Sequence, residues 1–137
     1  MQEITKQQTN YSPIKGFKDL RVYQNLYKAA LIVLKEIIPK LPENERFNLK
    51  DQAGRACMAP VAIIAEGYAK NHQQKAWKKY LYDAIGECNE MITHLSFIKD
   101  LYSERIDSKL CESLIETYTV SAKQLYTLAE NWKSYKK

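Results

Sequence analysis

The sequence has few of the residues that shape turn-rich or disulfide-bonded proteins. Its 137 residues include four glycines, four prolines and three cysteines. So little glycine and proline does not fit a β fold with many tight turns. The cysteines, Cys57, Cys88 and Cys111, are odd in number, far apart and surrounded by apolar residues. We therefore expect buried thiols in a reducing compartment, and neither a disulfide framework nor a zinc site.

Long hydrophobic runs and a leader sequence are also missing. No apolar run approaches the ~20 residues that a membrane span requires. The N-terminal stretch MQEITKQQTNYSPIKG lacks the apolar centre of a secretory signal. We therefore expect a cytoplasmic protein that makes no membrane contact. Hydrophobic residues form 45% of the chain and charged residues 27%, a balance typical of one globular domain with a core.

The chain is instead dominated by helical periodicity. Residues 1–16 are polar and predict a flexible N-terminal arm, and residues 17–137 predict a single domain. Within that domain, apolar residues recur every three or four positions over 17–38, 48–67, 73–102 and 108–135. Short polar connections separate these segments, two of them marked by Pro39 and by Asp107. The pattern predicts an all-α fold, an antiparallel up-down four-helix bundle.

The segment from Asn48 to Lys70 differs from the others because it consists largely of alanine and glycine. Small side chains let neighbouring helices approach closely, so we expect this helix at the packed centre of the bundle. Asn48 is a plausible N-cap. Pro60 lies inside the helix, where it removes a backbone donor and predicts a kink.

Two charged residues interrupt this small-residue segment. Arg55 and Glu66 are eleven residues apart, which places them on one helix face. One interpretation is an ion pair to another helix or to another subunit, and the other is that Arg55 faces a phosphate. We favour the ion pair because a buried charge needs a partner.

The net charge of +5 is dispersed along the chain, which by itself indicates a solvated basic surface. Local lysine clusters nevertheless stand at the start of the third helix and at the C-terminus. The first of them interleaves Lys75, Lys78 and Lys79 with Trp77, Tyr80 and Tyr82. Such a patch can stack bases and hold phosphates. The alternative is that Trp77 and Leu81 belong to the core while the lysines only face solvent.

Catalytic and metal-binding patterns are weak. Glu66, Glu87, Glu90 and His94 could approach one another in a bundle, but the Glu-x-x-His pair that di-metal bundles carry on two helices is absent. We interpret these residues as surface or interface charges. Cys57 or Cys88 with His94 could form a nucleophilic pair, although core cysteines are the commoner situation. We expect no catalytic residue and no cofactor.

Several motifs resemble a known family. They are Phe17-Lys-Asp-Leu-Arg-Val-Tyr-Gln24, Leu41-Pro-Glu-Asn-Glu-Arg-Phe-Asn-Leu49, Gln52-Ala-Gly-Arg-Ala56, Ile64-Ala-Glu-Gly-Tyr68 and the run from Tyr80 to Glu90. In this order they are similar to the four-helix-bundle family of 23S ribosomal RNA intervening-sequence proteins. That family includes relatives of the accessory variability determinant protein of diversity-generating retroelements. Ile63 departs from it, because the signature has asparagine there, and Ala59-Pro60-Val61 replaces a Ser-Ile-Pro run.

The resemblance implies a ring-like homopentamer. In the retroelement relatives, a basic pentamer binds RNA and a reverse transcriptase. Our leading hypothesis is therefore a non-catalytic accessory protein that binds nucleic acid, RNA in preference to DNA. The alternatives are a protein-interaction scaffold that uses its tyrosines and Trp132, and a carboxylate-metal enzyme. We expect structural or interface roles for Arg55, Glu66 and Gly67, and phosphate contacts from Lys75, Lys78, Lys79, Lys133, Arg21 and Lys28.

Overall fold

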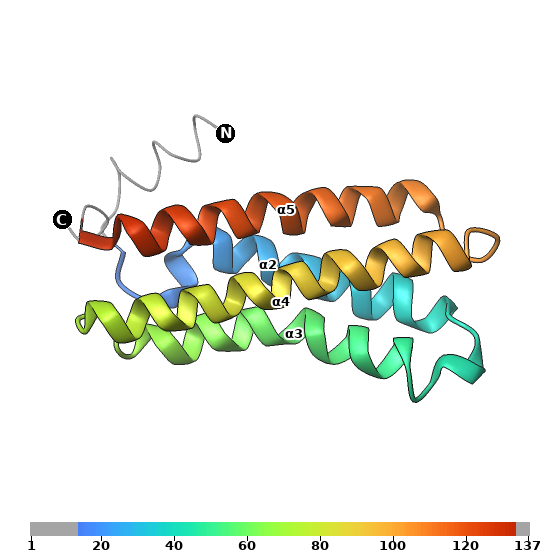
Figure 1. Cartoon of the computed structure of the whole chain (residues 1–137), viewed down its shortest axis with the longest axis horizontal. Helices are drawn as coiled ribbons and strands as arrows, with labels where there is room; N and C mark the ends of the chain where they lie inside the picture. The colour runs from blue at the N-terminus through green and yellow to red at the C-terminus, as the bar shows by residue number, and fades with distance from the viewer. Residues whose placement is uncertain (1–13, 134–137) are drawn as a thin grey trace.

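The computed structural model describes residues 14–133, and Figure 1 shows them as a bundle of four main helices. No strand occurs among these residues. The helices are α2 (Arg21–Ile32), α3 (Leu49–Tyr68), α4 (Gln74–Leu101) and α5 (Ser108–Glu130). The chain runs back and forth along the long axis, so each helix is antiparallel to the next. This confirms the predicted bundle, while residues 1–13 of the predicted arm and residues 134–135 of the predicted fourth helix lie outside the described residues.

The first predicted helix is not continuous. A 3-10 turn, η2 (Phe17–Asp19), comes first, and the buried Leu20 is extended before α2 begins. After α2 the chain forms a π-helical turn, η3 (Val33–Ile37), and a 3-10 turn, η4 (Ile38–Lys40). Pro39 lies in η4, where it cannot donate to a preceding carbonyl, so the regular helix ends before it. A last 3-10 turn, η5 (Glu43–Glu45), leads to α3.

The helix α3 supplies a small-residue face to the core. Its buried positions include Ala53, Ala56, Cys57 and Gly67, as the composition predicts, and the helix continues through the buried Pro60. Asn48 occupies the N-cap position, but its side chain does not cap. Instead, the Glu45 carboxylate accepts the backbone N–H of Leu49 at 3.4 Å. The expectation that the Asn48 side chain caps α3 is therefore wrong.

The helices α4 and α5 form the longest seam of the bundle. Trp77, Leu81, Met91 and other apolar residues of α4 are fully buried, and α5 supplies Leu114, Tyr118 and Leu125. Asp107 caps α5 as predicted, because its side chain accepts the backbone N–H of Lys109 at 2.9 Å.

All three cysteines lie in the core as free thiols, which confirms their predicted burial. Among residues 14–133, no helix combines the length and apolarity that a bilayer crossing requires.

Candidate nucleic-acid interface

The first turns of α4 carry the densest group of predicted phosphate ligands. Lys75, Lys78 and Lys79 lie here, and the first turn of α4 contains no aspartate or glutamate. Cations near a helix N-terminus oppose the helix macrodipole, so this arrangement does not help the helix to form.

An aromatic cluster beneath these lysines fixes where they lie. Trp77 is fully buried between them, and its ring meets the rings of Tyr68 and Trp132 at centroid distances of 5.7 and 5.5 Å. The indole N–H of Trp132 donates to the Asn71 carbonyl at 2.9 Å, which ties the residues after α5 to the α3–α4 connection. Trp77 is thus a core residue, and the buried Trp132 is not the partner contact that the scaffold alternative proposed.

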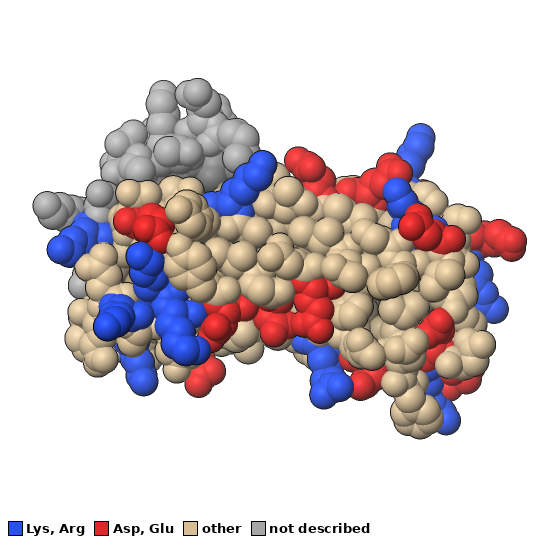
Figure 2. Space-filling view, in the orientation of Figure 1, with Lys and Arg blue, Asp and Glu red and all other residues tan. Residues whose placement is uncertain are grey.

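Lys133 lies at the same end of the bundle because it directly follows Trp132. In Figure 2, Lys and Arg side chains gather at this end, where α4 begins and α5 ends. We call the group Lys75, Lys78, Lys79 and Lys133 the basic end. Arg21 starts α2 at this end and is partly buried. Lys70, exposed after α3, belongs to the same region, although the sequence patterns did not single it out.

Two carboxylates accompany the basic end. Lys78 Nζ lies 3.2 Å from the Glu130 carboxylate of α5, and Lys79 Nζ lies 2.9 Å from Asp83. The Tyr82 hydroxyl also donates to Glu130. The hydrogen bonds from Tyr82 and Lys78 hold the pKa of Glu130 below its usual range, so Glu130 is ionised at neutral pH. Within residues 14–133, Lys75 and Lys133 have no such carboxylate partner.

Sequence reasoning missed Glu130 and Tyr126. The ring of Tyr126 meets the ring of Tyr82 edge to face, with centroids 6.0 Å apart. Both residues reach the basic end only through the antiparallel alignment of α4 with α5. The four-residue spacing of Lys78 and Tyr82, matched by that of Tyr126 and Glu130, is the signal that could have revealed the pairing.

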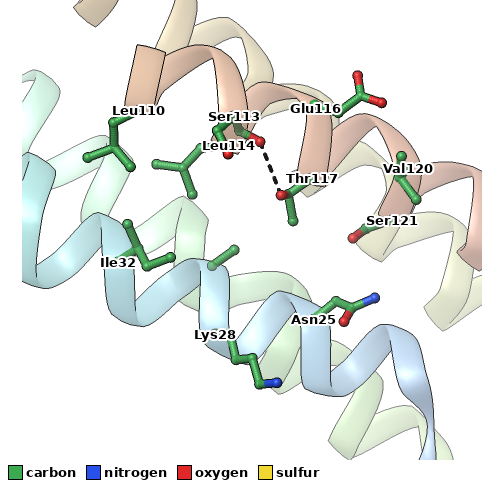
Figure 3. A pocket seen from close by; sticks show the side chains of 11 residues that line it. Asn25, Lys28, Ile32, Leu110, Ser113, Leu114, Glu116, Thr117, Val120 and Ser121 are labelled. Atoms are coloured by element: carbon green, nitrogen blue, oxygen red, sulfur yellow. Dashed lines mark hydrogen bonds between the residues drawn. The ribbon is translucent and has the colours of Figure 1, made fainter. Parts of the chain in front are cut away.

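Lys28 lies apart from the basic end. It is exposed on α2 and lines a groove of about 360 Å³ between α2 and α5. Figure 3 shows Asn25 on the side of α2 toward Ser121 of α5, whereas the Lys28 side chain turns away from α5. Lys28 is therefore not part of the same surface cluster as Lys75.

Arg55, Glu66 and Gly67, the residues of the family signature, have different surroundings from those we expected. The side chain of Arg55 is 76% exposed and pairs with Asp51 on its own helix at 3.0 Å. Within this chain Arg55 thus pairs with its own helix and not, as one form of the prediction had it, with another helix. The other form, an ion pair to another subunit, stays a prediction. Glu66 is exposed. Gly67 is buried, and a Cβ at this position would lie 2.4 Å from Tyr80 Cβ, so glycine permits the close contact of α3 with α4.

A second groove, of about 240 Å³, separates α3 from α4. Arg55 lines it together with Glu87 and Glu90. Burial, and then a hydrogen bond with Glu90, raises the pKa of Glu87. His94 Nε2 lies 3.7 Å from the Glu90 carboxylate. The part of the chain that the structure describes contains no group of three or more residues placed to hold a metal ion.

The core thiols stay protonated at neutral pH. Burial raises the pKa of Cys57 to about 11 and that of Cys88 to about 12. A thiol must ionise to act as a nucleophile, so neither cysteine is activated by its surroundings.

The fold and this surface define the class of protein: an all-α four-helix bundle with a braced, cation-rich end. The family model of the 23S rRNA-intervening sequence proteins matches residues 18–127, and the chain belongs to that family. The match runs from η2 to near the end of α5 and therefore spans the whole bundle. No curated protein matches the sequence as a relative.

Proposed function

We propose that this protein is a non-catalytic cytoplasmic accessory protein that binds RNA through the basic end. The carrying observation is that three lysines crowd the start of α4 against the helix macrodipole, with Lys133 at the same end. The name of the family, which refers to 23S rRNA, supports RNA in preference to DNA. Binding would proceed by release of counterions from the phosphate backbone.

The active form in this proposal is a homo-oligomer, in which copies of the basic end add to one positive field. We propose a pentamer, in keeping with the resemblance to the retroelement accessory proteins. Phe97 and Leu101 each expose more than half of their surface, and subunit contacts would cover such apolar side chains. Sedimentation equilibrium of the full chain gives the subunit number, and a monomer at micromolar concentration would contradict this part.

The RNA-binding test compares two double charge reversals. The Lys75→Glu, Lys79→Glu variant changes the basic end, and the Lys35→Glu, Lys109→Glu variant makes the same charge change at exposed lysines far from it. Fluorescence anisotropy with labelled RNA from 50 to 200 mM salt should show that the first variant binds weakly. The slope of log affinity against log salt should also fall by about one for each phosphate that the variant no longer binds.

The control variant should bind nearly as the parent protein does. Equal losses in both variants would mean that net charge matters and the basic end does not. Undetectable binding of the parent protein to RNA at 50 mM salt would refute the proposed function as a whole.

A second candidate function is a protein-interaction scaffold, for which a reverse transcriptase is one partner to test. The observation that favours it is the exposed Phe47, whose side chain is 83% accessible. Aromatic side chains left in water are typical of protein contacts. A purified reverse transcriptase encoded beside this protein should then bind it after nuclease treatment, and the Phe47→Ala variant should lose that binding.

A further inference from the structure

The basic end carries an exposed aromatic pair that charge alone does not explain. Tyr82 of α4 is 39% exposed and Tyr126 of α5 is 54% exposed. Their rings meet at an interplanar angle of 83°, so each ring leaves part of its surface open to solvent. Of the other aromatic residues nearby, Trp77 and Trp132 are buried, and Tyr68 and Tyr80 are partly buried. Tyr82 and Tyr126 are therefore the most exposed rings that α4 and α5 offer to a ligand at this end.

A carboxylate holds one ring of the pair, that of Tyr82, in place. Glu130 accepts the Tyr82 hydroxyl and also binds Lys78 Nζ, so one side chain of α5 holds two side chains of α4. Because Lys78 balances the charge of Glu130, the carboxylate is less repulsive to an incoming phosphate. An aromatic ring that is already held loses less conformational entropy when a ligand stacks on it.

The lysines lie on the side of the pair toward the end of the bundle. Lys75 precedes Lys78 by three residues on α4. Lys133 follows Glu130 by three residues, on the other side of the contact between α4 and α5. Since the two helices are antiparallel, both steps lead toward the same end. Lys75 and Tyr82 are seven residues apart, or about 10 Å along the helix. That length corresponds to roughly three stacked nucleotides.

We propose that Tyr82 and Tyr126 form a stacking platform for unpaired bases of single-stranded RNA, while Lys75, Lys79 and Lys133 hold the adjoining phosphates. Bases in a duplex are stacked on one another and the major groove of A-form RNA is closed to side chains, so such a platform can contact only unpaired bases. Lysines alone would bind single strands and duplexes through the same phosphates. This inference rests on the proposed function and adds its substrate class.

The test measures two RNAs against the full-length protein. The probes are a labelled ten-nucleotide oligouridine and a labelled blunt-ended RNA duplex of ten base pairs, both in 100 mM salt. The parent protein should bind the single strand more tightly. Tyr126→Ala should weaken oligouridine binding by about 5- to 150-fold, the effect of losing one base–aromatic stack, and should leave duplex binding unchanged. Tyr126→Phe, which keeps the ring, should restore the affinity.

Tyr27→Ala is the matched control, because Tyr27 is 49% exposed but lies on α2, away from the platform. It should leave both affinities unchanged. Equal affinity of Tyr126→Ala and the parent protein for oligouridine would overturn the platform, as would equal losses on both RNAs. A change in oligomer mass caused by Tyr126→Ala would also overturn it, because the pair would then be a subunit contact. In each of these cases, weaker RNA binding by the Lys75→Glu, Lys79→Glu variant would still support the proposed function.

Discussion

The two ends of the bundle are built differently. At the basic end, the rings of Tyr68, Trp77 and Trp132 pack together under a surface where lysines outnumber their carboxylate partners. At the opposite end, where α3 begins and α4 ends, the chain forms the irregular turns η3, η4 and η5. Cations and carboxylates are mixed there, and Glu43 binds both Arg46 and Lys50, at 3.2 and 3.4 Å.

The two ends therefore differ both in what keeps them rigid and in how their charges are balanced. Exposed ion pairs contribute little to stability, so the opposite end gains mainly neutrality from its pairs. The basic end keeps an excess of positive charge and depends on buried aromatic packing to keep its surface in shape. A phosphate ligand would therefore meet an excess of positive charge on a firm aromatic base at the basic end.

The largest expected effect comes from removing the aromatic base. Trp132 is almost fully buried and contacts Trp77 and Tyr68, so Trp132→Ala should lower the free energy of unfolding by about 3–5 kcal/mol. Phe47→Ala, at the opposite end, removes a side chain that is 83% exposed. It should change the free energy of unfolding by no more than about 0.5 kcal/mol. Urea denaturation followed by circular dichroism measures both.

Trp132→Phe keeps this test informative if the alanine variant does not fold. It retains a ring but loses the N–H that donates to the Asn71 carbonyl, which should cost about 1–3 kcal/mol because the acceptor is left without it. Similar small losses for Trp132→Ala and Phe47→Ala would show that the two ends are braced alike.

The next effect concerns the close contact of α3 and α4. Gly67→Ala would place a Cβ 2.4 Å from Tyr80 Cβ, so the helices must separate, and we expect a loss of about 1–3 kcal/mol. Gly54 is the matched control on the same helix, nearer the opposite end, because nothing lies within 4 Å of its added Cβ. Gly54→Ala should stabilise the protein by about 0.5–1 kcal/mol, since alanine favours helix. Thermal unfolding measures the stability of both variants, and equal shifts of their unfolding temperatures would contradict the prediction.

The sequence predicted what depends on periodicity within one helix. The limits of α3 and α4 and the free core thiols follow from apolar spacing, and the structure confirms them. The burial of Trp77 was one of two interpretations that the sequence left open, and the structure decides for it. Asp107 was recognised as a cap because its bond to Lys109 is local. Local patterns therefore define the bundle and the cations at the start of α4.

What depends on contacts between helices was not predictable in this way. The platform requires the alignment of Tyr126 with Tyr82, which periodicity within α5 does not specify. Arg55 was expected to pair with another helix or another subunit, but within this chain its partner lies one turn away on its own helix. The first helix was expected to be continuous over residues 17–38, yet the extended Leu20 and the π-helical turn η3 divide it.

The smallest expected effect distinguishes the two ends by pH. Among residues 14–133, a tyrosine hydroxyl donates to a glutamate at each end: Tyr82 to the exposed Glu130 at the basic end and Tyr102 to the partly buried Glu45 at the opposite end. Both bonds lower the pKa of the carboxyl group in the folded protein. Each carboxylate therefore contributes stability above its unfolded pKa of about 4.3. That contribution disappears as the pH falls through the lowered folded value.

Tyr82→Phe and Tyr102→Phe should each raise the pKa of their own glutamate toward its usual range, as carboxyl carbon chemical shifts followed from pH 2 to 7 would show. The Tyr102→Phe change should remove the largest cause of the Glu45 shift. In Tyr82→Phe the bond from Lys78 remains, so the pKa of Glu130 should recover only in part. At 1 M salt, screening should weaken the residual Lys78 effect and bring the two variants together. A full recovery for Glu130 at low salt would mean that Lys78 does not balance this carboxylate in solution, and the basic end would then carry a less neutralised acid beside its tyrosines.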